Sequence, residues 1–137
     1  MKTLYISLIL ALTTLFSSPV QAQDITVHNY VVLTKKIPQL KPILLTAKAL
    51  HEEQGKLFGD FQVIVCGQHI GDLTDKEQMT PYLQEAEAQG VTIVACGFSL
   101  KKFKVDAGSL PKGIKVVENG ILHNFRLQNK GYKSLSL

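Results

Sequence analysis

Short unbroken apolar runs alternate with amphipathic stretches along most of the chain. Runs of this length that are rich in β-branched residues are typical of strands buried on both faces of a sheet. The pattern therefore predicts four such strands, at residues 30–33, 61–65, 91–95 and 114–117.

Amphipathic stretches with glycine stops lie between these runs. Residues 42–54 place Ile43, Ala47 and Leu50 on one helical stripe, and Gly55 follows as a stop signal. Because strands and helices alternate at this spacing, we expect βαβ units, a parallel sheet and helices on both of its faces.

Thr80 and Pro81 precede the third apolar run and resemble a helix start. Threonine is a common N-cap, and proline is favoured at the first helical position. We therefore expect a helix over residues 82–89 that Gly90 ends.

Three further elements are predicted near the end of the chain. Residues 99–103 are expected to form a short helix, and Asn119 is expected to cap a last helix that carries Ile121, Leu122 and Phe125. Gly131 would end that helix, and residues 132–137 alternate weakly enough to form a fifth strand at an edge of the sheet.

The first 22 residues have the pattern of a secretory signal peptide. A short basic start, Met1-Lys2, precedes an apolar run over residues 4–16, and the small-residue pattern Val20-Gln21-Ala22 predicts cleavage near Ala22. We therefore expect a periplasmic or secreted protein with a single domain at residues 23–137. No later stretch approaches the ~20 apolar residues of a membrane helix, so no membrane span is expected in the mature chain.

Composition and motifs exclude several classes of function. The formal net charge is +4 with scattered lysines, which gives no indication of a nucleic-acid partner. A hydrophobic content of 45% argues against disorder. The chain contains neither G-x-G-x-x-G, nor a P-loop motif, nor G-x-S-x-G, so we expect no cofactor and no serine-hydrolase elbow.

One local pattern occurs twice and carries the candidate chemistry. Cys66-Gly67 and Cys96-Gly97 each follow an apolar run, so each cysteine is placed at the carboxyl end of a predicted strand, where ligands bind in parallel sheets. The glycines would allow a tight turn whose free amides favour a thiolate. The alternative is that both cysteines pack as small buried hydrophobes.

Residues 90–137 resemble the DsrE/DsrF-like family, which includes TusD-type sulfur-relay proteins and YchN-like proteins. The resemblance rests on the order of strand, cysteine, Pro-Gly turn, strand, helix and terminal Gly-Tyr, and a weaker match extends it over nearly the whole mature chain. The segments that carry it are Gly90 to Leu100, Leu110 to Val117, Arg126 to Gln128 and Gly131-Tyr132.

This resemblance implies a fold, an assembly and a site. The fold is a three-layer α/β/α sandwich with a five-stranded parallel sheet in the order 4-3-2-1-5, and the assembly is a trimer or hexamer. In sulfur-transferring members the cysteine after the third strand carries sulfur as a persulfide, and Cys96 occupies that position. An export signal is a departure from the relay proteins, which work in the cytoplasm.

The same strand order would place Cys66 and Cys96 at the ends of neighbouring strands. Neighbouring strands lie ~4.8 Å apart, and a disulfide needs Cα atoms ~4.4–6.8 Å apart, so an aligned register would allow one. Without that register the two thiols would stay unpaired and buried. An exported chain with close thiols is expected to rest as the disulfide.

Residues around the cysteines supply the candidate binding site. We expect Gly97, Phe98 and Ser99 to line it, with Gly67 and His69 from the other loop. His69 is either a base for a thiol or a solvated loop side chain. A metal site would need Cys66 and His69 with Cys96 or Asp72, but no recognised zinc spacing is present, so none is expected.

Lys101, Lys102 and Lys104 follow Cys96 and have two interpretations. They either attract an anionic sulfur species or a partner, or they form a solvated helix face.

Two hypotheses for function follow. The first is a sulfur carrier or sulfurtransferase with Cys96 as the persulfide carrier and Cys66 as a resolving thiol, acting with a sulfur donor or acceptor protein; whether it is an enzyme stays open. The alternative is a non-catalytic oligomeric module that binds a small ligand or partner and whose cysteines are structural.

Overall fold

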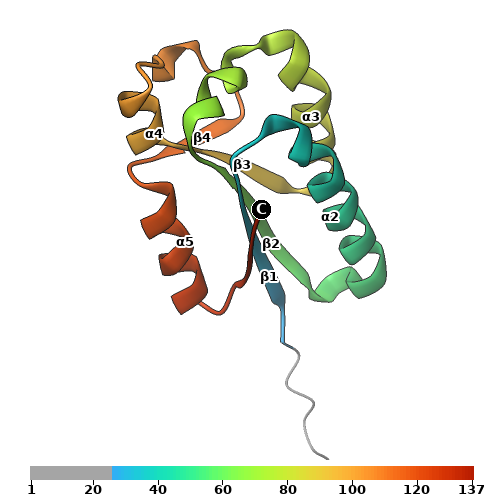
Figure 1. Cartoon of the computed structure of the whole chain (residues 1–137). Helices are drawn as coiled ribbons and strands as arrows, with labels where there is room; N and C mark the ends of the chain where they lie inside the picture. Colours follow the sequence, from blue (N-terminus) through green and yellow to red (C-terminus); the bar gives the residue numbers. More distant parts are fainter. Residues whose placement is uncertain (1–25) are drawn as a thin grey trace, which may run out of the picture.

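The computed structural model describes residues 26–137, so the predicted signal peptide lies outside the described part of the chain. Five parallel strands form one sheet in the order β4-β3-β2-β1-β5 (Figure 1). The strands are β1 (His28–Thr34), β2 (Phe58–Val65), β3 (Val91–Cys96), β4 (Ile114–Val117) and β5 (Lys133–Ser136). The predicted fold class and strand order are both confirmed.

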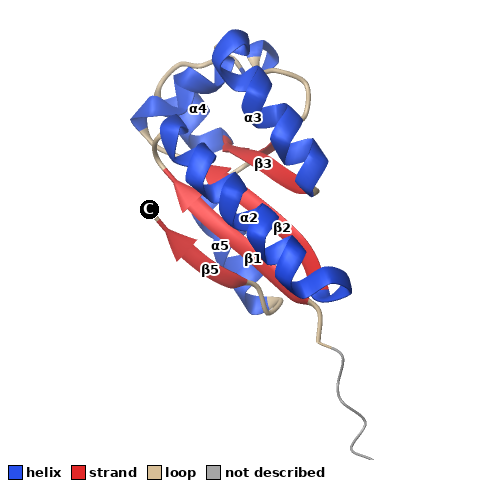
Figure 2. Ribbon diagram, turned by 90° about the vertical axis from the view of Figure 1, so that its right-hand side faces the viewer, coloured by secondary structure: helices blue, strands red, loops and turns tan. Residues whose placement is uncertain are grey.

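Helices cover both faces of the sheet, which gives the three layers (Figures 1 and 2). Helices α2 (Leu40–Gln54) and α3 (Lys76–Gln89) pack on one face, and α5 (Gly120–Asn129) packs on the other. The short helix α4 (Gly97–Lys102) follows β3 directly. Shorter 3₁₀ helices occupy Ile37–Gln39, Gly55–Leu57, Gln68–Thr74 and Ala107–Ser109.

Alternation along the strands divides the core in two, because successive side chains point to opposite faces. Val63 and Val65 of β2 and Ile93 of β3 belong to the larger core under α2 and α3. The smaller core lies under α5 and contains Val31, Leu33, Ile64, Cys66, Val94, Cys96 and Leu127. Both cysteines therefore lie on the α5 face.

The register between β2 and β3 sets the relative height of the two cysteines. Val63 pairs with Ile93 and Val65 pairs with Ala95. Cys66 and Cys96 directly follow the paired residues Val65 and Ala95, so the two cysteines lie side by side at the carboxyl edge of the sheet.

Helix α3 begins earlier than the sequence predicted, and the proposed start at Thr80-Pro81 is wrong. Asp75 is the N-cap, because its Oδ1 accepts a hydrogen bond from the Gln78 amide at 3.0 Å. Thr80 instead donates its hydroxyl to the Lys76 carbonyl at 2.6 Å, and Pro81 lies inside the helix.

Three other predicted helix ends agree with the structure, whereas the short helix α4 begins at Gly97 instead of residue 99 and α5 ends at Asn129, before Gly131. Gly55 and Gly90 end α2 and α3 with φ of 53° and 68°, a backbone region that favours glycine. Asn119 caps α5, since its Oδ1 accepts from the amides of Ile121 and Leu122.

The outer surface of α5 is unusually apolar. Leu127 and Asn124 point into the structure and are buried, whereas Ile121, Leu122 and Phe125 are exposed. No helix within residues 26–137 is long and apolar enough to cross a membrane.

Candidate functional site

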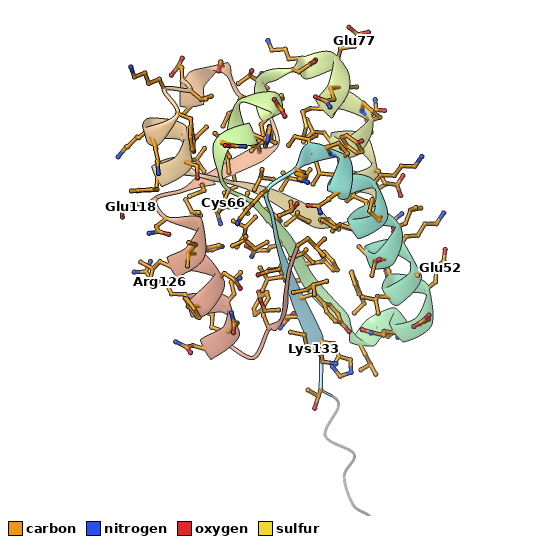
Figure 3. The ribbon with its side chains drawn as sticks, in the orientation of Figure 1. Glu52, Cys66, Glu77, Glu118, Arg126 and Lys133 are labelled. Carbon is orange, nitrogen blue, oxygen red and sulfur yellow. The ribbon has the colours of Figure 1, made fainter. Side chains whose placement is uncertain are left out.

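The two cysteines form the centre of the candidate site, at the carboxyl ends of β2 and β3. Figure 3 shows Cys66 beside the amino-terminal end of α5. Both side chains are buried, with 7% of Cys66 and 3% of Cys96 exposed, and both thiols are free in the structure. The aligned register brings the two cysteines together, but the structure contains no bond between them. The disulfide expected for close thiols is therefore not formed here, and both cysteines are unpaired and buried.

Gly120, the first residue of α5, lies against both cysteines. Its amide donates a hydrogen bond to Cys96 Sγ at 3.2 Å. A Cβ placed on Gly120 would lie 2.6 Å from Cys66 Sγ and 3.1 Å from Cys96 Cβ. Glycine is therefore needed here for close approach, and this contact brings the positive end of the α5 dipole to the sulfur.

Ser99 connects the two cysteine loops. The Gly67 amide donates a hydrogen bond to Ser99 Oγ at 2.9 Å, and the Ser99 side chain is buried. The hydroxyl keeps its own proton for donation to Cys96, three residues earlier. Of the predicted binding residues, Ser99 and Gly67 thus lie directly at the thiols.

The surroundings of the two sulfurs act on their pKa values in opposite directions. Burial alone would raise the pKa of Cys96, but hydrogen bonds from the Ser99 hydroxyl, the Gly120 and Ser99 amides and the Cys66 thiol outweigh it and lower that pKa. Burial, followed by the charge and hydrogen bond of Cys96, raises the pKa of Cys66 to about 12, against a small opposing effect of Lys35. The pair therefore favours a Cys96 thiolate beside a protonated Cys66.

The two glycines after the cysteines have different roles, which corrects the prediction that both make tight turns. Gly67 has φ of +90° and makes the predicted turn. Gly97 is part of α4, and its small size is needed because a Cβ there would lie 2.8 Å from the Val117 carbonyl oxygen. Phe98 donates its amide to the Glu118 carbonyl at 2.8 Å, and 60% of its side chain is exposed.

His69 lies in the same loop as Gly67 but turns to other partners. Its ring contacts the Gln68 side-chain amide at 3.2 Å and lies 3.8 Å from the Asp72 carboxylate, with about half of the side chain exposed. The role of thiol base is therefore not supported by its contacts. Within residues 26–137, no group of three or more His, Cys, Asp and Glu side chains is arranged to hold a metal ion.

Two basic residues beside the site, Lys35 and Lys36, are not predicted by the local sequence pattern. Lys35 and Lys36 follow β1 and line a cavity of about 360 Å³ together with Gly67, Gln68, His69 and Phe103. The signal that would have found them is topological, because β1 ends at the same sheet edge as β2. Lys101, Lys102 and Lys104 are exposed, and the Lys102 ammonium lies 5.7 Å from the centre of the Phe103 ring.

A larger groove, of about 780 Å³, lies elsewhere on the molecule. It runs between α3 and the turn before β4, with Leu83, Val91 and Pro111 among its lining residues, and it contains none of the candidate site residues. The cysteine pair therefore identifies the candidate site, and the larger groove does not.

Known proteins support the fold but not an activity. No family model matches the chain, and no curated protein matches it. The solved structure of the protein of unknown function MTH1491 from Methanobacterium thermoautotrophicum is similar, with a TM-score of 0.63 and 21% identity over 80% of this chain and 99% of that one.

The conserved protein of unknown function BT1422 from Bacteroides thetaiotaomicron is also similar, with a TM-score of 0.59 and 21% identity over 80% of this chain and 95% of that one. At this level of identity, the two structures support the α/β fold with its five-stranded parallel sheet and nothing finer.

Proposed function

We propose that this chain is an exported sulfur carrier or sulfurtransferase that holds sulfane sulfur as a persulfide on Cys96. The observation that carries the proposal is the Cys96 sulfur, which the Gly120 amide reaches at 3.2 Å and whose pKa is lowered beside a protonated Cys66. A thiolate is the nucleophilic form of cysteine, so this is the sulfur expected to react first. The sequence resemblance to the DsrE/DsrF-like family supports the same position for the persulfide.

The transfer needs two steps. The Cys96 thiolate attacks the outer sulfur of a donor such as thiosulfate; the donor's S–S bond breaks, and sulfite leaves with the electron pair. The new persulfide takes a proton from water. An acceptor thiolate then attacks the outer sulfur, and Cys96 leaves as the thiolate while the proton stays on the transferred sulfur.

Cys66 has a supporting role in this proposal and is not the resolving nucleophile suggested by the sequence. Its pKa of about 12 keeps it protonated at neutral pH, and a protonated thiol attacks slowly. The same proton donates a hydrogen bond to the Cys96 sulfur. Cys66 is thus a positioning residue that stabilises charge on its neighbour.

The burial of both sulfurs restricts the donor. With only 3% of Cys96 exposed, we expect small sulfur compounds to react in preference to folded protein disulfides. A buried persulfide would also be shielded from water and from other thiols until an acceptor binds.

Mass spectrometry tests the proposal on the protein of residues 23–137. After reduction, removal of the reductant and incubation with thiosulfate or polysulfide, we expect one added sulfur on the peptide that contains Cys96. Cys96→Ser is expected to remove the adduct. Cys66→Ala is expected to keep it but form it more slowly at neutral pH, because the Cys96 thiolate loses a hydrogen-bond donor.

Absence of any adduct on demonstrably reduced Cys96 would refute the proposal. That result would favour the non-catalytic module, in which the two cysteines serve only as packing residues of the smaller core.

A further inference from the structure

A basic cavity lies next to the cysteine pair, at the end of β1. The residues that line it include two lysines and a histidine around a volume of about 360 Å³, namely Lys35, Lys36 and His69 together with Gly67, Gln68 and Phe103. Such a volume holds a small inorganic anion together with water.

Lys35 lines this cavity and also lies against the turn that follows Cys66. The position that a Cβ on Gly67 would take lies 3.5 Å from Lys35 Cγ and 3.7 Å from its Cβ, so the aliphatic stem of Lys35 lies along the turn that follows Cys66. Gly67 faces the cavity and also donates its amide to Ser99, the residue beside Cys96. One turn therefore separates the cavity from the reactive pair, and the Lys35 charge acts on Cys66 across it.

The two lysines of the cavity have no acidic partner in the described part of the chain. Among residues 26–137, no carboxylate lies within ion-pairing distance of Lys35 or Lys36. The Asp72 carboxylate does not line the cavity and lies 3.8 Å from the His69 imidazole. Two lysines that line one cavity, with no acidic partner among the described residues, favour an anionic ligand.

We propose that this cavity is an oxyanion subsite, in which Lys35 and Lys36 hold the sulfonate end of a thiosulfate-like sulfur donor. This inference rests on the proposed function, because it assigns the donor class for Cys96. The subsite would hold the donor by its SO₃ group and leave the outer sulfur free to meet the thiolate. When the S–S bond breaks, the same lysines stabilise the sulfite that leaves with the electron pair.

Binding can be measured without the chemistry in the Cys96→Ser chain. Titration calorimetry with thiosulfate is expected to show saturable binding that sulfate competes for. Lys35→Met keeps the stem that lies along Gly67 and removes only the charge, so we expect binding about tenfold weaker, as for the loss of one charge-assisted hydrogen bond.

Lys48→Met is the matched control, because Lys48 is exposed on α2 at the other face of the sheet, and its affinity for thiosulfate is expected to be unchanged. No saturable binding at millimolar thiosulfate to the folded chain would overturn the subsite. Equal affinity in the Lys35→Met and Lys48→Met chains would overturn it as well.

The same titration separates this inference from the proposed function. If the Cys96→Ser chain binds thiosulfate through Lys35 while reduced Cys96 in the parent chain gains no sulfur, the subsite stands and sulfur transfer fails. If Cys96 gains sulfur from thiosulfate at the same rate in the parent and Lys35→Met chains, transfer stands and the subsite fails.

Discussion

Cys66 and Cys96 lie at equal height on neighbouring strands, but different groups surround their sulfurs. Cys96 Sγ accepts the Gly120 amide and lies beside Ser99, whereas Cys66 Sγ is surrounded by apolar groups and by Cys96 itself. At this scale the hydrogen bonds from the Ser99 hydroxyl, from the Gly120 and Ser99 amides and from the Cys66 thiol decide which cysteine ionises first.

We therefore predict that the two thiols lose their protons at widely separated pH values. In iodoacetamide labelling followed by peptide mapping, the Cys96 midpoint is expected below the ordinary value of 9.0 and the Cys66 midpoint near 12. Ser99→Ala removes the largest stabilising hydrogen bond and is expected to raise the Cys96 midpoint. Coincident midpoints in the parent chain would contradict the assignment of Cys96 as the thiolate.

The raised pKa of Cys66 also links stability to alkaline pH. The unfolded chain loses this proton near pH 9.0, while the folded chain keeps it to about pH 12, so the Cys66 contribution is present below pH 9 and falls as pH rises through that window. Tyr132 adds a similar effect, because burial and its hydrogen bond to Asp60 raise its pKa to about 12. In urea unfolding, the Cys66→Ala chain should therefore lose less free energy of unfolding than the parent between pH 9 and 12.

Gly120 provides a second test at the scale of one residue. Gly120→Ala places a methyl group 2.6 Å from Cys66 Sγ and 2.8 Å from Ile64 Cγ2, and we expect this overpacking to lower the free energy of unfolding by about 1–3 kcal/mol. Gly71→Ala is the control, since its Cβ would meet only Val105 Cγ2, at an ordinary 3.5 Å. Equal stability of the two variants in urea unfolding would contradict the close approach at Gly120.

At the scale of elements, the start of α3 shows where local sequence signals compete. Thr80-Pro81 matches the pattern of a helix start, but the structure caps α3 at Asp75. This earlier start adds more than one turn to the helix and places Met79 in the core. The burial of Met79 decides between the two starts, and burial depends on tertiary packing that a local motif does not report. Caps at Asn119 and Gly90 had no such competitor and could be predicted from the sequence.

A proline inside a helix has a measurable cost. Pro81 lacks the amide that would bond back to residue 77 and crowds the preceding turn. We predict that Pro81→Ala raises the thermal midpoint, with a gain of about 1–3 kcal/mol once the more flexible unfolded chain is subtracted from the ~3 kcal/mol helical penalty. A lower midpoint would show that Pro81 contributes packing that outweighs its helical cost.

At the scale of the whole molecule, the strand order assembles the site. Helix α5 connects β4 at one edge of the sheet to β5 at the opposite edge (Figure 1). Its first residue, Gly120, therefore lies against Cys66 and Cys96 at the carboxyl ends of β2 and β3. The sequence alone indicates that two strands end in cysteine. It does not show the register or the crossing, and for that reason Gly120 and Lys35 were missed.

The same crossing leaves an apolar surface without a covering layer. A groove of about 510 Å³ between α5 and β5 is lined in part by Leu33, Ile121, Phe125 and Leu137, and both Ile121 and Phe125 are nearly 60% exposed. Leu135 of the edge strand β5 is exposed as well. Exposed apolar surface beside an open sheet edge is typical of a protein interface.

We therefore predict that the protein of residues 23–137 forms a homo-oligomer through this surface, with a trimer or hexamer expected from the family resemblance. The double substitution Ile121→Lys and Phe125→Lys places two like charges on the contact and is expected to give monomers, because burial of unpaired charge is unfavourable. Leu45→Lys serves as the control, since Leu45 is similarly exposed on α2 at the other face, and its assembly should be unchanged. Light scattering at micromolar concentration checks all three chains. A monomeric parent would contradict the prediction of assembly, and an oligomeric double variant would show that another surface forms the contact.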